Sequence, residues 1–264
     1  MGGPGILVGQ GTAEEEQLAR REKGGFWIGV VAVLFYPLSW MAKFVQRGTE
    51  RIPREGGVLL VMNHVSHYDP IVDAVFVHRN KRVPRILAKE SVLRIPIFGW
   101  IARTVGTIPV YRGTAAARHS LTAAVAALDE GKMVLIYPEG TITKDPDGWP
   151  MYPRTGVARL ALDSDVPVLP VARWGTKAIL DGYTHKFRPL PRKPVHFVVG
   201  EPVDLSAYRG QEVTPALLRE VTHLLMNRVV DLVAEIRGEP APKDFFRPPV
   251  AGKDAEKPDE ERAS

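Results

Sequence analysis

Residues 63–69, NHVSHYD, contain the residue types that move protons near neutral pH. Histidine is the side chain whose ordinary pKa best suits proton transfer at neutrality. A carboxylate hydrogen-bonded to one ring nitrogen fixes the tautomer and stabilises the imidazolium that forms when the other nitrogen takes a proton. Asp69 follows His64 by five residues, which is close enough across a turn for this contact. We therefore predict that His64 is a general base and that Asp69 is its partner.

The same spacing fits other kinds of site. His64 could be a structural residue bonded to the backbone, with Asp69 as a helix cap, and from spacing alone this is the commoner case. A metal site built on His64, His67 and Asp69 is a second alternative, although no further cluster of His, Asp or Glu lies nearby in the sequence. Ser66 could be a nucleophile with His67, but no Gly-x-Ser-x-Gly surrounds it, so a cap or turn role fits better.

Three more segments place polar groups or prolines at the ends of apolar runs. The run GTIPVYR ends on Arg112, and a guanidinium can bind phosphate through two hydrogen bonds. The run YPEGT contains Gly140, which lets backbone amides approach an anion, and Thr141, which adds a hydroxyl donor. Residues 166–171, VPVLPV, are typical of an edge strand or a bent strand in the core. Each segment alone is a weak indication of a site.

Apolar runs alternate with helical patterns between residues 52 and 200. The expected strands are 58–62, 86–88, 107–110, 133–137, 166–172 and 195–200. Helices are expected to begin near Pro70 and to cover 114–130, 156–162 and 214–237. This alternation predicts a single α/β domain with a mixed, mostly parallel central sheet flanked by helices. A strand end that leads into a helix is where such folds place reactive groups, which suits residues 63–69.

An apolar segment precedes this domain. Between Lys23 and Lys43 lie 19 residues without a charge, whereas a membrane span takes about 20 mostly apolar residues. Glycines and Pro37 interrupt the segment, so we favour a helix that lies in or dips into one leaflet over a full span, with a buried core helix as the alternative. The predicted organisation is a mobile leader at 1–24, a membrane-associated helical segment at 25–47, the α/β domain at 48–237 and a disordered tail at 238–264.

Charge and composition restrict the classes of binding partner that the sequence suggests. The formal net charge is +5, and residues 25–237 alone carry +8, so the positive field belongs to the folded region. Such a field suits an anionic membrane surface or a phosphorylated substrate. Nucleic acid is not an expected partner, because no basic helix is present. The sequence contains no cysteine, which excludes disulfides, a thiolate nucleophile and a zinc site built on thiolates.

Taken in this order, the four segments resemble the glycerolipid acyltransferase family, typified by 1-acylglycerol-3-phosphate acyltransferase. The family's first block is Asn-His-x-Ser-x-x-Asp, and residues 63–69 match it at every fixed position. The second block ends in an Arg, here Arg112. The third is Pro-Glu-Gly-Thr-Arg-Ser, matched by residues 138–141, and the fourth is a proline-containing apolar strand, matched by residues 166–171. The resemblance runs over roughly residues 50–200.

The resemblance implies that the protein is an acyltransferase of phospholipid biosynthesis. His64 would deprotonate the acceptor hydroxyl, which attacks the acyl thioester directly, and Asp69 would orient His64. The implied acceptor-binding residues are Arg112, Glu139, Gly140 and Thr141. The acceptor would be 1-acylglycerol-3-phosphate, the product phosphatidic acid, and the donor acyl-CoA or acyl carrier protein, with no cofactor and no metal. Membrane lipids are the implied partners, and the cytoplasmic face of the plasma membrane is the implied location.

The sequence departs from the family pattern at the third block. Ile142 stands where the family has an Arg, and Thr143 stands where it has a Ser. Another residue must then hold a phosphate, and the candidates are Lys144, Arg154, Arg173 and Lys177. Alternative acceptors are glycerol-3-phosphate, another lysophospholipid, a glycolipid or an aminolipid. A noncatalytic lipid-binding membrane protein is a further alternative, against which the intact pair of His64 and Asp69 argues.

Overall fold

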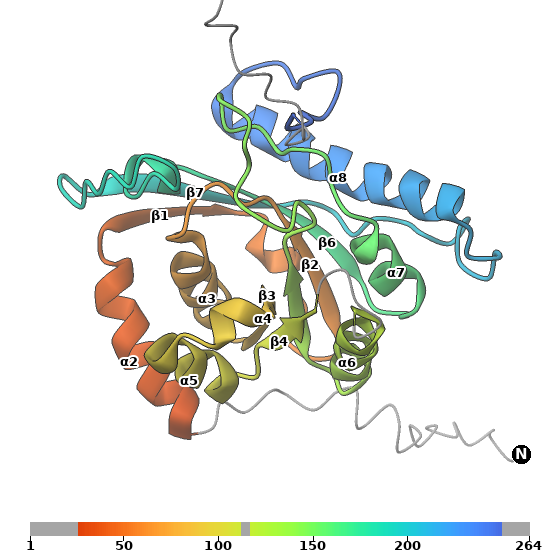
Figure 1. Ribbon diagram of the computed structural model, residues 1–264, viewed down its shortest axis with the longest axis horizontal. Coiled ribbons are helices and arrows are strands. Elements are labelled where there is room, and N and C mark those ends of the chain that lie inside the picture. The colour runs from red at the N-terminus through yellow and green to blue at the C-terminus, as the bar shows by residue number, and fades with distance from the viewer. Residues whose placement is uncertain (1–25, 112–116, 250–264) are drawn as a thin grey trace, which may run out of the picture.

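The computed structural model describes residues 26–111 and 117–249 (Figure 1). Its strands are β1 Ala42–Arg47, β2 Val58–Met62, β3 Pro84–Lys89, β4 Ile108–Val110, β5 Met133–Ile136, β6 Val168–Trp174 and β7 Lys193–Val199. Its α-helices are α2 Phe26–Ser39, α3 Asp69–Arg79, α4 Glu90–Leu93, α5 Pro96–Thr104, α6 Ala117–Asp129, α7 Gly156–Leu162 and α8 Pro215–Arg237. Two short 3-10 helices are η1 Thr49–Arg51 and η2 Thr176–Ala178.

The strands form one seven-stranded sheet in the order β1-β7-β6-β2-β5-β3-β4. Every neighbouring pair is parallel except β6 with β7, so the sheet is mixed and mostly parallel, as predicted. The sequence of β2, VLLVM, is buried at all five positions. A continuous apolar run is expected of a parallel strand that helices cover on both faces. The single α/β domain is therefore confirmed.

Helices cover both faces of the sheet, and alternate residues of β2 pack into the two layers. Leu60 belongs to a buried cluster with Phe76 of α3. Leu59, one position earlier, points to the other face and belongs to a cluster with Leu160 of α7 and Val229 of α8. Figure 1 shows α8 lying across one face, with α2 and α3 on the other. The two-residue period of the strand thus fixes both helical layers.

The predicted helical segment at 25–47 is helical only over α2. β1 begins at Ala42 and pairs in parallel with β7, so the sheet starts six residues before the predicted domain boundary at 48. Its six residues, AKFVQR, alternate between more buried and exposed positions, as in an edge strand. Three of the six are polar, so the sequence shows no clear alternation of apolar and polar residues. Among residues 26–111 and 117–249, no helix is long and apolar enough to cross a membrane. The predicted leader lies outside the described residues.

The predicted disordered tail, 238–264, is ordered in its first part. The backbone N–H of Tyr152 donates to the carbonyl of Phe246 at 2.9 Å, and the Arg247 guanidinium lies 3.8 Å from the centre of the Tyr152 ring. These contacts with an aromatic ring hold the first part of the tail in place. A composition rich in Pro, Lys and Glu does not reveal them. Residues 250–264 lie outside the described chain.

Of the two alternatives for the two-proline run, the structure shows a core strand and not an edge strand, because β6 lies between β7 and β2. Proline lacks the N–H that a sheet ladder uses. Pro170 is tolerated where one ladder stops, since the antiparallel pairing with β7 begins one residue later, at Val171. The Pro170 carbonyl still accepts a hydrogen bond from the Gly200 N–H at 2.8 Å.

Candidate active site

Neighbouring parallel strands gather polar residues at one edge of the sheet. His64 lies just beyond the end of β2, Glu139 lies just beyond β5, and Arg173 is near the end of β6. Lys89 ends β3, the next strand in the sheet. The carboxyl ends of parallel strands are where α/β folds bind ligands. The sheet order therefore brings together residues that are far apart in the sequence.

His64 and Asp69 form the contact that the sequence predicts. The Nδ1 atom of His64 lies 2.7 Å from Oδ2 of Asp69. The Asp69 carboxylate is fully buried, and the His64 side chain is 14% exposed. With its proton on Nδ1, the imidazole donates to Asp69 and leaves Nε2 to accept a proton. The geometry is that of a base with an orienting carboxylate, while the catalytic roles stay a prediction.

Asp69 is held by more than His64. Its Oδ2 atom also accepts the backbone N–H groups of Val65 and Ser66, at 2.7 and 2.8 Å. Its Oδ1 atom accepts the hydroxyl of Thr176 at 2.5 Å. Asp69 is the first residue of α3, where the helix dipole favours a negative charge. The carboxylate is therefore fixed in place before it meets the imidazole.

Arg173 is the counter-ion of this site and is itself completely buried. Its Nη2 lies 2.5 Å from Oδ2 of Asp69, and its Nη1 lies 2.6 Å from Oδ2 of Asp73, one turn further along α3. The hydroxyl of Tyr137 also donates to Asp73. The side-chain amide of Asn63 donates to the carbonyl of Arg173 and accepts its backbone N–H, each at 2.9 Å. These bonds join β2, β5, β6 and α3 into one polar network.

The charges of the network explain the direction of each pKa. Burial alone would raise the pKa of Asp69, but Arg173 and the hydrogen bond with His64 outweigh it, so this pKa lies below its usual value. Burial raises the pKa of Asp73 to about 6, although Arg173 opposes the rise. Burial lowers the pKa of His64, while Asp69 opposes the decrease. Above about pH 6 the two carboxylates and Arg173 sum to a single negative charge, which favours an imidazolium on His64 once a proton arrives.

Glu139 contacts the backbone, and it does not line the cavity described below. Its Oε1 accepts the N–H of His64 at 2.7 Å, and its Oε2 accepts the N–H of Met151 at 3.0 Å. The side chain is buried, which raises its pKa to about 8 even though these two hydrogen bonds oppose the rise. Glu139 therefore fixes the position of the His64 backbone, a role that the sequence did not suggest. Its predicted contact with the acceptor stays a prediction.

The other predicted binding residues have separate positions. Gly140 and Thr141 line the same cavity as His64. Gly140 has a φ of 71° and closes a turn in which its N–H donates to the carbonyl of Tyr137 at 2.9 Å. A residue other than glycine is strained in this conformation. Arg112 lies outside the described residues.

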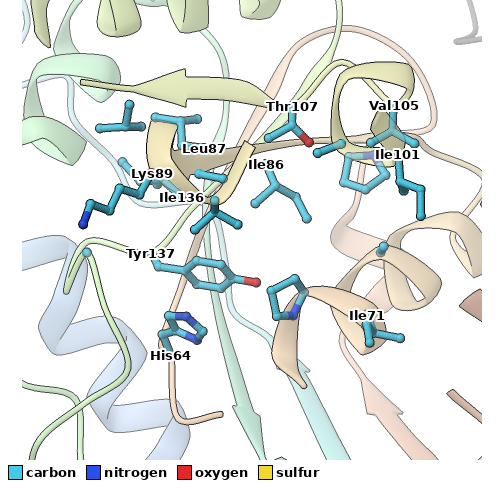
Figure 2. A pocket seen from close by; sticks show the side chains of 18 of the residues that line it. His64, Ile71, Ile86, Leu87, Lys89, Ile101, Val105, Thr107, Ile136 and Tyr137 are labelled. Carbon is cyan, nitrogen blue, oxygen red and sulfur yellow. The ribbon is translucent and has the colours of Figure 1, made fainter. Parts of the chain in front are cut away.

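A cavity of about 940 Å³ adjoins His64 (Figure 2). Most of its lining is apolar, with contributions from α2, α3, α5 and the ends of β3, β4 and β5. Figure 2 shows His64 next to Tyr137, with Val105 and Thr107 across the cavity from them. The His64 and Tyr137 rings stack with centroids 4.4 Å apart. The size is within the usual range for small-molecule sites.

Of the four residues predicted as possible phosphate ligands, only one lines the cavity among the described residues. Arg154 lines the cavity and is exposed, whereas Arg173 is buried among carboxylates. Lys144 and Lys177 are not part of the lining. Lys89 does line it, and this residue was missed by the sequence reasoning. Its position in the sequence could have identified it, because Lys89 directly follows the apolar run ILA of a predicted parallel strand.

The fold and the site together define an α/β protein with a buried His and Asp pair beside an apolar cavity. Residues 43–174, half of the chain, match the model of the family named Acyltransferase. The chain belongs to the acyltransferase family.

Curated relatives and a solved structure agree with this assignment. The chain is 31% identical over 140 residues to a 1-acyl-sn-glycerol-3-phosphate acyltransferase of Borreliella burgdorferi, covering 52% of this chain and 54% of that protein. It is 30% identical over 177 residues to an N-acylphosphatidylethanolamine synthase of Arabidopsis thaliana, covering 62% of each. The crystal structure of a 1-acyl-sn-glycerophosphate acyltransferase from Thermotoga maritima matches with a TM-score of 0.58 at 26% identity, over 78% of this chain and 80% of that one. The chain thus spans a little over half the length of the first two of these relatives.

Replacement of Arg173 tests whether its charge holds the network together. Arg173→Gln leaves Asp69 and Asp73 buried without their shared cation, so the free energy of unfolding should fall by about 3–5 kcal/mol. Arg173→Lys retains a positive charge, so its free energy of unfolding should fall by less than that of Arg173→Gln. Urea denaturation measures both variants, with Arg219→Gln on the exposed face of α8 as the control. An Arg173→Gln protein as stable as the control would show that the network does not depend on this cation.

The protonation of His64 gives a second test that needs no substrate. Because burial lowers its pKa, the imidazole should titrate below 6.5 in the folded protein. Asp69→Asn removes the charge that favours the imidazolium, so the midpoint should fall further. NMR of the ring protons measures both midpoints, and His64→Gln assigns the resonance. A midpoint at or above 7 would contradict the environment described here.

Proposed function

We propose that the protein transfers a fatty acyl group from an acyl thioester to the free hydroxyl of 1-acylglycerol-3-phosphate, forming phosphatidic acid. The observation that carries this proposal is the position of His64 beside an apolar cavity, with Nδ1 bound to the buried Asp69 so that Nε2 is left to accept a proton. A base alone is common to many reactions. A base next to about 940 Å³ of mostly apolar space suits a reaction on a long hydrocarbon chain.

The reaction follows from the protonation state of His64. Nε2 takes the proton of the acceptor hydroxyl while the hydroxyl oxygen attacks the carbonyl carbon of the thioester. The tetrahedral intermediate then expels the thiolate, which takes the proton back from the imidazolium. Asp69 stays ionised throughout and stabilises that imidazolium. No acyl-enzyme forms on this route, in keeping with a sequence that contains no cysteine.

The phosphate of the acceptor needs a ligand other than the Arg of the third block, because Ile142 stands at that position. Ile142 is buried, and its carbonyl accepts the hydroxyl of Tyr183 at 2.9 Å. We propose that Lys89 and Arg154, which line the cavity, bind the phosphate together with Arg112. The relationship to an N-acylphosphatidylethanolamine synthase supports an aminolipid as a second acceptor, in which an amine replaces the hydroxyl as nucleophile.

The donor and the location belong to the same proposal. Acyl-CoA and acyl carrier protein are both polyanionic, and the charge of +8 on residues 25–237 would attract either. The acceptor and the product are membrane lipids, so we propose that the enzyme acts at the cytoplasmic face of the plasma membrane. The chemistry proposed here uses no cofactor and no metal ion.

Replacement of His64 tests the reaction. His64→Ala should lower thiol release from the thioester by about 10²–10⁴-fold, since a general base contributes that much. The assay uses purified protein in detergent with acyl-CoA and acyl carrier protein thioesters and a panel of acceptors, and mass spectrometry identifies the acylated position. His67→Ala is the matched control, because His67 also lines the cavity but has no contact with Asp69 among the described residues. Turnover of His64→Ala within tenfold of the wild type would refute the proposed base.

Filling the cavity tests whether it holds the acyl chain. Thr107→Phe places a ring across the cavity from His64, so a hexadecanoyl thioester should lose on the order of tenfold or more in kcat/KM, while a decanoyl thioester loses little. Thr104→Phe makes the same change at a position that does not line the cavity and should leave both values alone. An equal loss for both chain lengths would show that the cavity has another use.

A further inference from the structure

Residues 182–193, GYTHKFRPLPRK, follow η2 and end on Lys193, the first residue of β7; they are here named the basic loop. The basic loop holds four Lys and Arg residues and no Asp or Glu. Its apolar side chains point outward: Phe187 is 56% exposed and Leu190 is 64% exposed. Lys186 and Arg188 are also exposed, and within the described part of the chain neither forms an ion pair. Exposed cationic and apolar side chains therefore alternate along the basic loop.

The basic loop has a defined conformation. Leu180 and Phe187 form an antiparallel bridge, and the N–H of Arg188 donates to the carbonyl of Ile179 at 2.7 Å. The N–H of Asp181 donates to the carbonyl of Lys186 at 3.1 Å. These bonds fix the outward direction of Phe187 without burying it. Because the backbone around Phe187 is already fixed, little conformational entropy would be lost when this side chain binds a partner.

The basic loop is continuous with the exposed face of α2. Figure 1 shows it projecting from the end of the molecule at which α2 leads into β1. The Arg192 guanidinium donates to the carbonyl of Trp40 at 2.5 Å and lies 5.0 Å from the centre of its ring. Trp40 is 55% exposed, and Val33 and Leu38 of α2 are exposed as well. Two segments about 150 residues apart thus build a single apolar and basic surface.

The opposite side of the basic loop contacts the candidate active site. The hydroxyl of Ser66, in the NHVSHYD segment, donates to the carbonyl of Leu180 just before the loop at 2.5 Å. The rings of His67 and His185 are parallel, with centroids 6.3 Å apart. A surface that rests on the loop would therefore lie close to the residues that perform the chemistry.

We propose that the basic loop is a second bilayer-docking element, which binds an anionic lipid surface next to α2. Interfacial protein surfaces combine aromatic and aliphatic side chains, which enter the headgroup region, with Lys and Arg, which pair with anionic lipids. An acidic protein partner would use the charges but leave Phe187 and Leu190 without apolar cover. The proposal rests on the membrane role in the proposed function, and it adds the loop that orients the site toward the lipid.

Vesicle binding of the full chain tests the proposal. The probes are vesicles of phosphatidylcholine alone and vesicles that also contain phosphatidylglycerol, measured by co-sedimentation at two salt concentrations. Each basic residue at an anionic surface contributes roughly fivefold to affinity. Lys186→Gln with Arg188→Gln should therefore weaken binding to the anionic vesicles by roughly tenfold or more and lower its salt dependence. Phe187→Ser with Leu190→Ser should weaken binding to both kinds of vesicle.

A matched control separates the loop from the general positive field. Arg219→Gln with Arg228→Gln removes the same charge from α8, on the other face of the sheet, and should change vesicle binding less than twofold. Equal losses in the two charge variants, or wild-type binding in both loop variants, would overturn the proposal. So would unchanged vesicle binding with a higher KM for the acyl carrier protein thioester, which would assign the loop to the donor. Absence of thiol release by the wild type in detergent would instead refute the proposed function, whatever the vesicles show.

Discussion

The rest of the site depends on one buried ion pair, between Arg173 and Asp69. A carboxylate and a guanidinium without solvent exposure each cost several kcal/mol to desolvate, and only close pairing with further hydrogen bonds offsets that cost. Here backbone groups form hydrogen bonds with both ions, and Asp73 forms a second ion pair with the guanidinium of Arg173. The pair joins the start of α3 to the end of β6, so the same interaction closes the fold and sets the charge beside His64. The same ion pair therefore contributes to the stability of the domain and to the charge at the candidate site.

The parts of the fold that the sequence predicts are those that local patterns determine. The apolar runs at 58–62 and 133–137 became β2 and β5, and Thr214 caps α8 by accepting the N–H of Leu217, as its position before Pro215 suggests. β1 was missed because an edge strand with a polar outer face carries little apolar signal. The ordered part of the tail was missed because its contacts are with residues about a hundred positions earlier.

The candidate site divides in the same way. The contact of His64 with Asp69 spans five residues and could be read from spacing. The role of Arg173 could not, because its partners lie about a hundred residues away and meet it only through the order β6-β2-β5. Glu139 shows a second limit. A sequence block identifies a position at a strand end, but it does not show that both carboxylate oxygens accept backbone N–H groups.

The substrates proposed here have one part that water solvates and one part that it does not, and the molecule separates these parts in space. Polar groups gather at the carboxyl edge of the parallel strands, and the proposed phosphate ligands Lys89 and Arg154 line the cavity there. Apolar groups line the cavity between that edge and α2, whose opposite face is exposed. A hydrocarbon chain that enters from a bilayer against α2 would therefore not cross water before its thioester reaches His64. On the proposed function, the apolar helix and the polar edge of the sheet belong to one domain because each would contact one half of the same amphipathic substrate.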